Sequence, residues 1–355
     1  MERITSPESA NLGKLCESLA ANAQHAGDQW PESQLAMCGD AGVYEWFLPT
    51  EFGGQAWSEA DIVKGYLRLS ASCLTTTFVI TQRMGACKRI AASSNRTLAE
   101  TLLPDLMSGK TFATVGISHL TTSRRHLAKP VLQASEVEGG FLLDGFSPWV
   151  TGATAADMLV LGASLDDGRE VLLAADAKSN GVQIEPPPRL VALTGSQTGQ
   201  VRLNQVFVPD ERVIDGPIAN VMQGSRGAMS GGLQTSTLAV GVASAALDFL
   251  RTEAEKRTDL QEPAQQFAIE YQKLEFDLLQ AASGIESCSS QDLRTRANSL
   301  VLRLSQAALT AAKGAGFVEG HPAGRWCREA LFFLVWSCPQ PVLNANLCQL
   351  ASMAT

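Results

Sequence analysis

The chain has 355 residues, a formal net charge of −8 and a pI near 5.2. This acidic balance argues against a nucleic-acid backbone or an anionic membrane as its main partner. Hydrophobic residues make up 45% of the sequence, enough to fill the core of an enzyme with two or three domains or fused subdomains.

Neither a membrane span nor a metal site is indicated. The longest strongly apolar run, residues 331–336, is far shorter than the ~20 residues that cross a bilayer, and the first residues contain no apolar signal core. No pair of the eight cysteines has C-x-x-C spacing, and the four histidines lack the spacing of metal ligands. We therefore expect a cytoplasmic protein with free thiols.

Residues 1–112 are predicted to form an N-terminal helical domain. Apolar residues recur at near-helical spacing after a capping Ser58, at Ile62, Val63, Tyr66, Leu67 and Leu69. Turn signals lie on either side of this pattern, at Gly53-Gly54 and Ser108-Gly109.

Residues 113–213 change character and are predicted to form a β domain. Short β-branched runs recur at intervals of about ten residues, which is typical of an antiparallel sandwich or barrel. Turn signals separate them at Asp144-Gly145, Asp167-Gly168 and Asn180-Gly181.

Residues 214–355 are predicted to form a C-terminal helical bundle. Long helical patterns cover residues 235–256, 267–282, 297–313 and 325–336, and Pro339 and Pro341 should end the last of them. The chain has no βαβ alternation and no G-x-G-x-x-G, so a Rossmann site is disfavoured.

The segment around Trp149 carries the first functional signal. Asp144-Gly145 predicts a hairpin turn, after which Trp149 and Thr151 stand two residues apart and would face the same side of a strand. An indole beside a hydroxyl suits a flat, hydrogen-bonding ring such as a flavin. A hairpin with a core tryptophan is the alternative interpretation.

Five stretches, taken in order, resemble the acyl-CoA dehydrogenase superfamily. They are Phe47-Leu48-Pro49 to Gly54, Leu103-Pro104 to Gly109, Leu143-Asp144-Gly145 to Asp157, Val206-Phe207-Val208-Pro209, and Gly314-Ala315-Gly316-Phe317 to Arg328-Glu329. The resemblance implies an α+β multidomain fold: an N-terminal helical domain, a middle antiparallel β-sandwich or barrel domain, and a C-terminal four-helix bundle.

The same resemblance implies FAD as cofactor, an acyl thioester or related acyl substrate, and a homodimer or homotetramer. Trp149 would pack beside the isoalloxazine and Thr151 would bond its N5 edge. Ser118 and Ser123 fall where the family's flavin segment contributes to the site. Arg257 resembles the arginine that meets the neighbouring subunit's FAD pyrophosphate, with a solvated charge at a helix end as the alternative.

The catalytic base of the family has no match in this sequence. Ser337 stands at the position of the usual glutamate, and residues 231–242, where other members place the base, contain no acid. His119 and His126 flank Arg124-Arg125 and could act as acid or base, or bind an anion, or belong to a solvated basic loop. His321 lies in a loop that also resembles flavin monooxygenases of this fold, where a structural role is the alternative.

Three hypotheses therefore follow from the sequence. The leading one is an FAD-dependent oxidoreductase resembling acyl-CoA dehydrogenases. The second is a flavin-dependent monooxygenase on the same fold, which needs no base for an α-proton. The third is a non-catalytic homologue that acts as a partner subunit.

Overall fold

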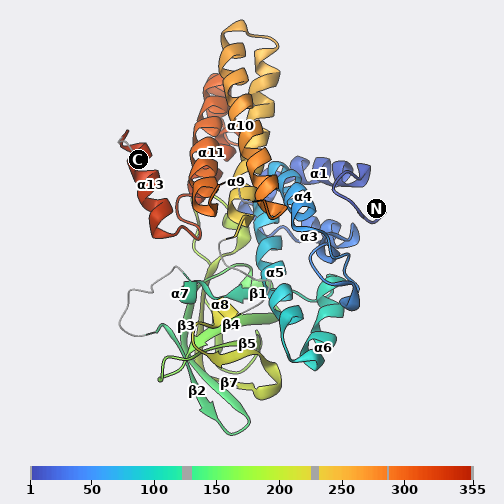
Figure 1. Ribbon diagram of the computed structural model, residues 1–355, viewed down its shortest axis with the longest axis vertical. Helices are drawn as coiled ribbons and strands as arrows, with labels where there is room; N and C mark the ends of the chain where they lie inside the picture. Colours follow the sequence, from blue (N-terminus) through green and yellow to red (C-terminus); the bar gives the residue numbers. More distant parts are fainter. Residues whose placement is uncertain (1, 122–129, 225–231, 286–287, 353–355) are drawn as a thin grey trace.

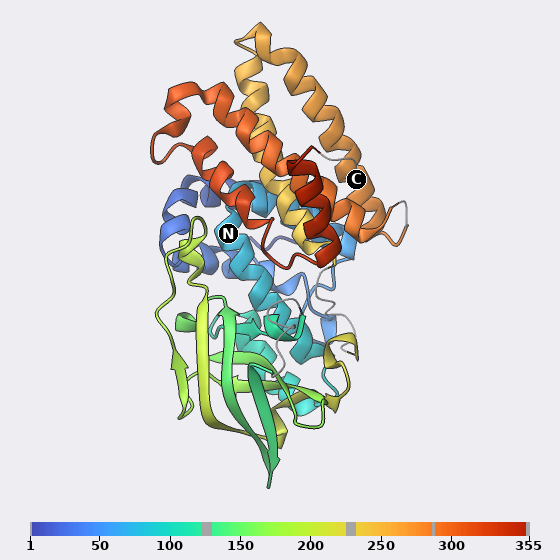
Figure 2. The same ribbon diagram turned by 90° about the vertical axis from the view of Figure 1, so that its left-hand side faces the viewer.

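The computed structural model describes residues 2–121, 130–224, 232–285 and 288–352. Helices occupy both ends of the chain and a single sheet lies between them in sequence (Figure 1). The sheet forms one end of the elongated molecule and the helical bundle the other, with the N-terminal helices packed beside both (Figures 1 and 2). This arrangement confirms the fold class predicted from the sequence.

The N-terminal helices form around apolar stripes with capped ends. Ser58 caps α4 by accepting from the backbone N–H of Asp61, and Asn95 caps α6 in the same way through Leu98. These helices are α1 (Ala10–Ala21), α2 (Ala23–Asp28), α3 (Glu32–Asp40), α4 (Glu59–Ser72), α5 (Leu74–Ala92) and α6 (Arg96–Met107).

The central sheet has eight strands in the order β6-β7-β3-β2-β4-β5-β8, with β1 paired to β4. Most pairings are antiparallel, but β1 and β2 each pair with β4 in parallel. The strands are β1 (Ala113–Gly116), β2 (Leu132–Val137), β3 (Gly140–Val150), β4 (Met158–Ser164), β5 (Glu170–Asp176), β6 (Val182–Ile184), β7 (Gly199–Pro209) and β8 (Val213–Ile218), and the short α7 (Ser118–Thr121) follows β1.

The predicted hairpin turn at Asp144-Gly145 is wrong. Strand β3 runs without a break from Gly140 to Val150, and the turn that joins it to β2 lies at Glu138-Gly139. Gly145 instead marks an irregularity in the pairing of β3 with β7, with φ at +120°. An Asp-Gly pair often marks a glycine with positive φ. In this chain that conformation serves a bulge within β3 and not a turn between two strands.

The bundle is built from α9 (Gln234–Ala254), α10 (Gln261–Ala282), α11 (Ser290–Ala312) and α12 (Pro322–Phe332), preceded by the short α8 (Val221–Gly224). The helix predicted over residues 325–336 ends earlier, at Phe332, and Pro339 and Pro341 stand at the start of a further helix, α13 (Gln340–Leu350). Proline favours the first turn of a helix because the N–H groups there have no intrahelical partner.

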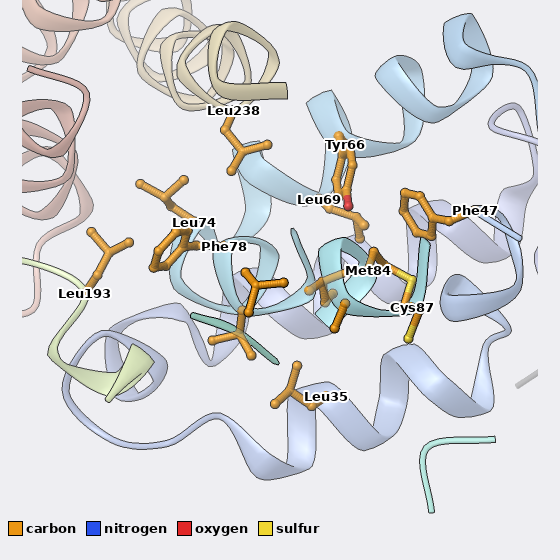
Figure 3. Close-up of a cluster of buried hydrophobic side chains, with 14 of the residues drawn as sticks. Leu35, Phe47, Tyr66, Leu69, Leu74, Phe78, Met84, Cys87, Leu193 and Leu238 are labelled. Carbon is orange, nitrogen blue, oxygen red and sulfur yellow. The ribbon is translucent and has the colours of Figure 1, made fainter. Parts of the chain in front are cut away.

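The N-terminal helices and the bundle share one hydrophobic core. Figure 3 shows Tyr66, Met84 and Leu238, from α4, α5 and α9, within one cluster of buried side chains. Gly241 brings α9 close to α4, since a Cβ there would lie 2.6 Å from the carbonyl oxygen of Leu67. The hydroxyl of Ser70 also donates to the carbonyl of Leu238 at 2.7 Å.

Among the described residues, no helix combines the length and apolar character needed to cross a bilayer.

Candidate active site

A cavity of about 390 Å³ lies where the N-terminal helices, the sheet and the bundle meet. Its walls come from α4 and α5, from the β1–α7 segment, from the end of β3, from the start of α9 and from the turn after α12. The lining residues are Glu59, Ile62, Val63, Tyr66, Thr81, Gln82, Met84, Gly85, Lys88, Arg89, Val115, Ile117, Ser118, Thr121, Trp149, Gly232, Leu233, Gln234, Thr235, Thr237, Trp336 and Ser337.

One face of α5 forms a long wall of this cavity. Its lining positions are 81, 82, 84, 85, 88 and 89, a spacing that places them along one side of a helix. A Cβ at Gly85 would make only ordinary contacts, at 3.5 Å with Nη1 of Arg89 and 3.6 Å with Cγ1 of Val115. The cavity therefore extends along α5.

Trp149 faces the cavity and is not a core residue. Half of the side chain, 50%, is exposed, whereas the neighbouring Val150 is fully buried. The irregular pairing between Ser147 and Val150 of β3 with β7 turns the indole outward here. The flat apolar face of Trp149 is thus available to a ligand in the cavity.

Thr151 lies near Trp149 in sequence but does not line the cavity. Its Oγ1 lies 2.9 Å from Oγ1 of Thr198, and its carbonyl accepts from the hydroxyl of Thr114 at 2.7 Å. Strand β3 ends at Val150, so the alternation that would place Thr151 on the same side as Trp149 does not continue to it. The structure does not bring the two side chains together at the cavity wall.

Ser118 lines the cavity at the point where β1 gives way to α7. Its Oγ is buried and has no hydrogen-bond partner among the described residues. The parallel pairing of β1 with β4 fixes this position, because Gly116 lies opposite Leu161. A buried hydroxyl without a partner is costly, so a ligand group that bonded it would be stabilised.

His119 follows Ser118 but faces away from the cavity wall. It is 7% exposed, and its Nε2 lies 2.7 Å from the carbonyl oxygen of Gly162. Burial lowers the pKa of His119, so the neutral ring donates from Nε2 to that carbonyl. The other two candidates in this segment, Ser123 and His126, lie outside the described residues.

The turn after α12 places Trp336 and Ser337 in the wall of the cavity. Trp336 packs edge-on against Phe78 of α5, with 4.9 Å between ring centroids. Arg294 of α11 donates from Nη2 to the carbonyls of Phe333 and Trp336, at 3.0 and 2.8 Å. Burial lowers the pKa of Arg294 to about 10. Ser337 itself has φ at +45°, a conformation that is uncommon for a residue with a side chain.

Arg257 and His321 both lie outside this cavity. Arg257 donates from Nη1 to the carbonyl of Ala311 at 2.8 Å and pairs with Asp259 at 3.1 Å. His321 caps α12, since its Nδ1 accepts from the backbone N–H of Ala323 at 3.2 Å, and its ring packs edge-on against Phe249. In this subunit both residues have structural contacts, and neither is brought to Trp149.

Sequence reasoning missed three charged residues of the cavity wall. Glu59 of α4 and Lys88 and Arg89 of α5 line it, but each lies in a helical pattern where a charge normally marks the solvated face. The only signal in the sequence was that the charged pair Lys88-Arg89 falls within a helical stretch of mostly uncharged residues, which the structure shows to be buried. Among the described lining residues, Glu59 is the sole carboxylate.

Comparison with known proteins finds distant sequence relatives and solved structures of the same fold. No family model matches the chain. A probable acyl-CoA dehydrogenase of Bacillus subtilis, YngJ, is 21% identical over 344 residues, which cover 88% of each chain. Mitochondrial isovaleryl-CoA dehydrogenase of Solanum tuberosum is 26% identical over 254 residues, 65% of this chain and 60% of that protein.

A third relative is named for a different activity. The oxygenase component of the FADH2-dependent resorcinol hydroxylase of a Rhizobium species is 26% identical over 215 residues, or 59% of this chain. The match spans about half, 48%, of that protein's length.

Solved structures share this fold over nearly the whole length of the chain. Butyryl-CoA dehydrogenase of Megasphaera elsdenii has a TM-score of 0.81 at 15% identity and covers 96% of this chain and 97% of its own. The chain therefore has the acyl-CoA dehydrogenase fold. A glutaryl-CoA dehydrogenase of Mycobacterium smegmatis, solved in complex with FADH2, has a TM-score of 0.79 at 14% identity, covering 98% and 96%.

The cavity combines an apolar platform with an isolated polar group. It offers the exposed indole face of Trp149 and the unpartnered, buried hydroxyl of Ser118. Such a combination of an apolar platform and isolated polar groups is typical of a cofactor site. The described residues contain no group of three or more histidine, cysteine or acidic side chains that could hold a metal ion.

Proposed function

We propose that the chain is an FAD-dependent oxidoreductase acting on an acyl thioester or related acyl substrate. The observation that supports it most strongly is the cavity itself. Trp149, Ser118 and Ser337, from three separate segments of the chain, all line it. FAD would supply two-electron redox chemistry there. The shared fold with a glutaryl-CoA dehydrogenase solved with FADH2 supports the same cofactor.

In this proposal the chain's own residues bind and orient the ring. Trp149 packs against it, and Ser118 donates to or accepts from a polar edge. Thr151 would bond the ring by exchanging its present contact with Thr198. Arg257 would reach a pyrophosphate held in a neighbouring subunit, for which its contacts with Ala311 and Asp259 would have to rearrange.

The two candidate reactions, dehydrogenation and monooxygenation, differ in whether they need a base that accepts a proton from the substrate. Removal of an α-proton from a thioester needs a positioned base, and Ser337 has no carboxylate. Glu59, the sole acid among the described lining residues, is on α4, whereas Ser337 follows α12. Because a monooxygenase does not need this base, and because oxygenase components are among the relatives, we retain a flavin monooxygenase as the second candidate.

Anaerobic reduction tests the leading proposal. The purified chain, loaded with FAD, is mixed without oxygen with a panel of coenzyme A thioesters of increasing acyl length. Bleaching of the flavin absorbance by at least one thioester is the expected result. If no thioester bleaches it, while chemically reduced protein forms an oxygen adduct when air is admitted, the monooxygenase proposal replaces this one. Failure of both reactions would favour a non-catalytic partner subunit.

A matched pair of variants tests the site. Trp149→Leu should weaken FAD binding at least tenfold, because an exposed aromatic platform is removed. Trp57→Leu is the control, since Trp57 stacks on Trp46 in the N-terminal domain, with 4.2 Å between centroids, and does not line the cavity. Equal FAD affinity in both variants would remove Trp149 from the site.

A further inference from the structure

The cavity wall has an unpaired cation at the far end of α5. Lys88 lines the cavity and is only partly exposed. Its Nζ lies 5.5 Å from the centroid of the Phe47 ring. Within the described residues, no carboxylate comes within ion-pairing distance of this ammonium, and Glu59 acts on it only from further away. A lysine so placed has lost part of its hydration, and a contact with an aromatic ring replaces it only in part.

The charges around Lys88 leave that end of the cavity positive. Two cations, Lys88 and Arg89, and one acid, Glu59, are the charged groups among the described lining residues, a net charge of +1. Arg89 donates from Nη1 to the carbonyl of Gly85 at 2.8 Å. Burial lowers the pKa of the Lys88 ammonium by more than the nearby Glu59 raises it. An anion beside Lys88 would offset that cost of burial.

The positive end is well separated from the turn that carries Ser337. Trp336 contacts α5 at Phe78, and Lys88 lies ten residues further along the same helix. At 1.5 Å per residue the two points on the helix axis are about 15 Å apart. Between them the wall is formed by Thr81, Gln82, Met84 and Gly85, so the cavity is continuous along this part of the helix.

From this geometry we infer that the substrate carries a second negative charge at the end of its acyl group, and that Lys88 binds it. This inference rests on the proposed function, because it assumes that the reacting end of an acyl thioester lies near Trp149 and Ser337. The class that fits is a dicarboxylic acyl thioester, in which the free carboxylate pairs with the ammonium.

Paired thioesters test the inference. Monocarboxylic and dicarboxylic coenzyme A thioesters of equal chain length, such as pentanoyl and glutaryl or hexanoyl and adipoyl, are titrated into the FAD-loaded protein. Binding is followed by perturbation of the flavin spectrum, which requires no turnover. The dicarboxylic member of at least one pair should bind tenfold or more tightly, and Lys88→Met should reduce this ratio at least tenfold. Lys88→Arg should keep most of it.

The control is Lys64→Met. Lys64 pairs with Glu8 and Asp61 at 3.1 and 3.3 Å on the surface of α4 and does not line the cavity, so its loss should leave the ratio unchanged. A wild-type ratio near one, or a ratio that survives in Lys88→Met, overturns the inference even if thioesters reduce the flavin. Tight dicarboxylate binding without any reduction instead overturns the proposed reaction and leaves the Lys88 site standing.

Discussion

At the scale of single residues, the cavity wall contains residues that the sequence singled out and others that it did not. The sequence picked out Ser118, Trp149 and Ser337, and all three line one cavity. It could not identify Lys88, because the pattern of α5 does not show which helix face meets a cavity and which meets solvent. The strain at Ser337, with φ at +45°, depends on carbonyls held by Arg294, a contact between distant parts of the chain. Their roles in binding or catalysis remain predictions.

Protonation of buried His119 should make stability depend on pH. Because the pKa of His119 is lowered from 6.5 by burial, the unfolded chain binds a proton more readily than the folded one. This residue therefore contributes no pH dependence above about 6.5 and lowers stability as the pH falls from there towards its folded pKa. In urea titrations at pH 7.5 and 5.5, His119→Gln should lose less stability than the wild type on acidification. His25→Gln, at an exposed site, should behave like the wild type; identical behaviour of all three would contradict the assignment.

At the scale of elements, local patterns predicted strands well and connections less well. The alternation in residues 131–137 and 140–143 predicted β2 and the start of β3. The Asp144-Gly145 pair was interpreted as a turn, but β3 continues through it because its pairing with β7 extends to Val150 opposite Gly199. Partners distant in the chain therefore decide whether a glycine forms a turn or a bulge.

Two glycines, Gly139 in the turn between β2 and β3 and Gly145 within β3, should respond differently to alanine. A Cβ at Gly145 would lie 2.2 Å from the carbonyl oxygen of Val131, whereas nothing lies within 4 Å of one at Gly139. Both residues have positive φ, so alanine costs about 1–2 kcal/mol of backbone strain at either position. Gly145→Ala should lose a further 1–3 kcal/mol of unfolding free energy, roughly the cost of overpacking. Equal losses in denaturant titrations would show that the bulge is not tightly packed.

For the whole molecule, the prediction of three zones in sequence holds, but the zones do not pack as three separate units. The N-terminal helices and the bundle share a core across α4 and α9, and the cavity has walls from both and from the sheet. Composition and periodicity predicted helices, strands and their order. They could not show that the cavity requires all three parts, since that follows only from long-range packing. The domain limits at residues 112 and 213 remain a prediction.

Packing between α4 and α9 should be sensitive to one added methyl group. Gly241→Ala places a Cβ 2.6 Å from the carbonyl oxygen of Leu67 and should lower the unfolding free energy by about 1–3 kcal/mol. Gly27→Ala on α2 meets nothing within 4 Å and should raise stability by up to about 1 kcal/mol through helix propensity. Calorimetry that found the same sign for both variants would contradict this close approach.

Assembly into a homodimer or homotetramer is an expectation of the superfamily resemblance. Phe317 and Val318, next to one another before α12, are 88% and 64% exposed, and a second copy of the chain could cover them. Light scattering should give a mass of two or four chains for the wild type. A monomer that still binds FAD fully would contradict the expected assembly.

Retention of FAD by the purified chain tests the central claim most directly. The protein is incubated with FAD, passed through a desalting column and examined by visible absorption, with the flavin quantified after denaturation. We expect close to one FAD per chain in the wild type and a clear loss in Trp149→Leu, with Trp57→Leu unchanged. A colourless wild-type protein that retains no FAD would contradict the account, because the cavity would then not be a flavin site.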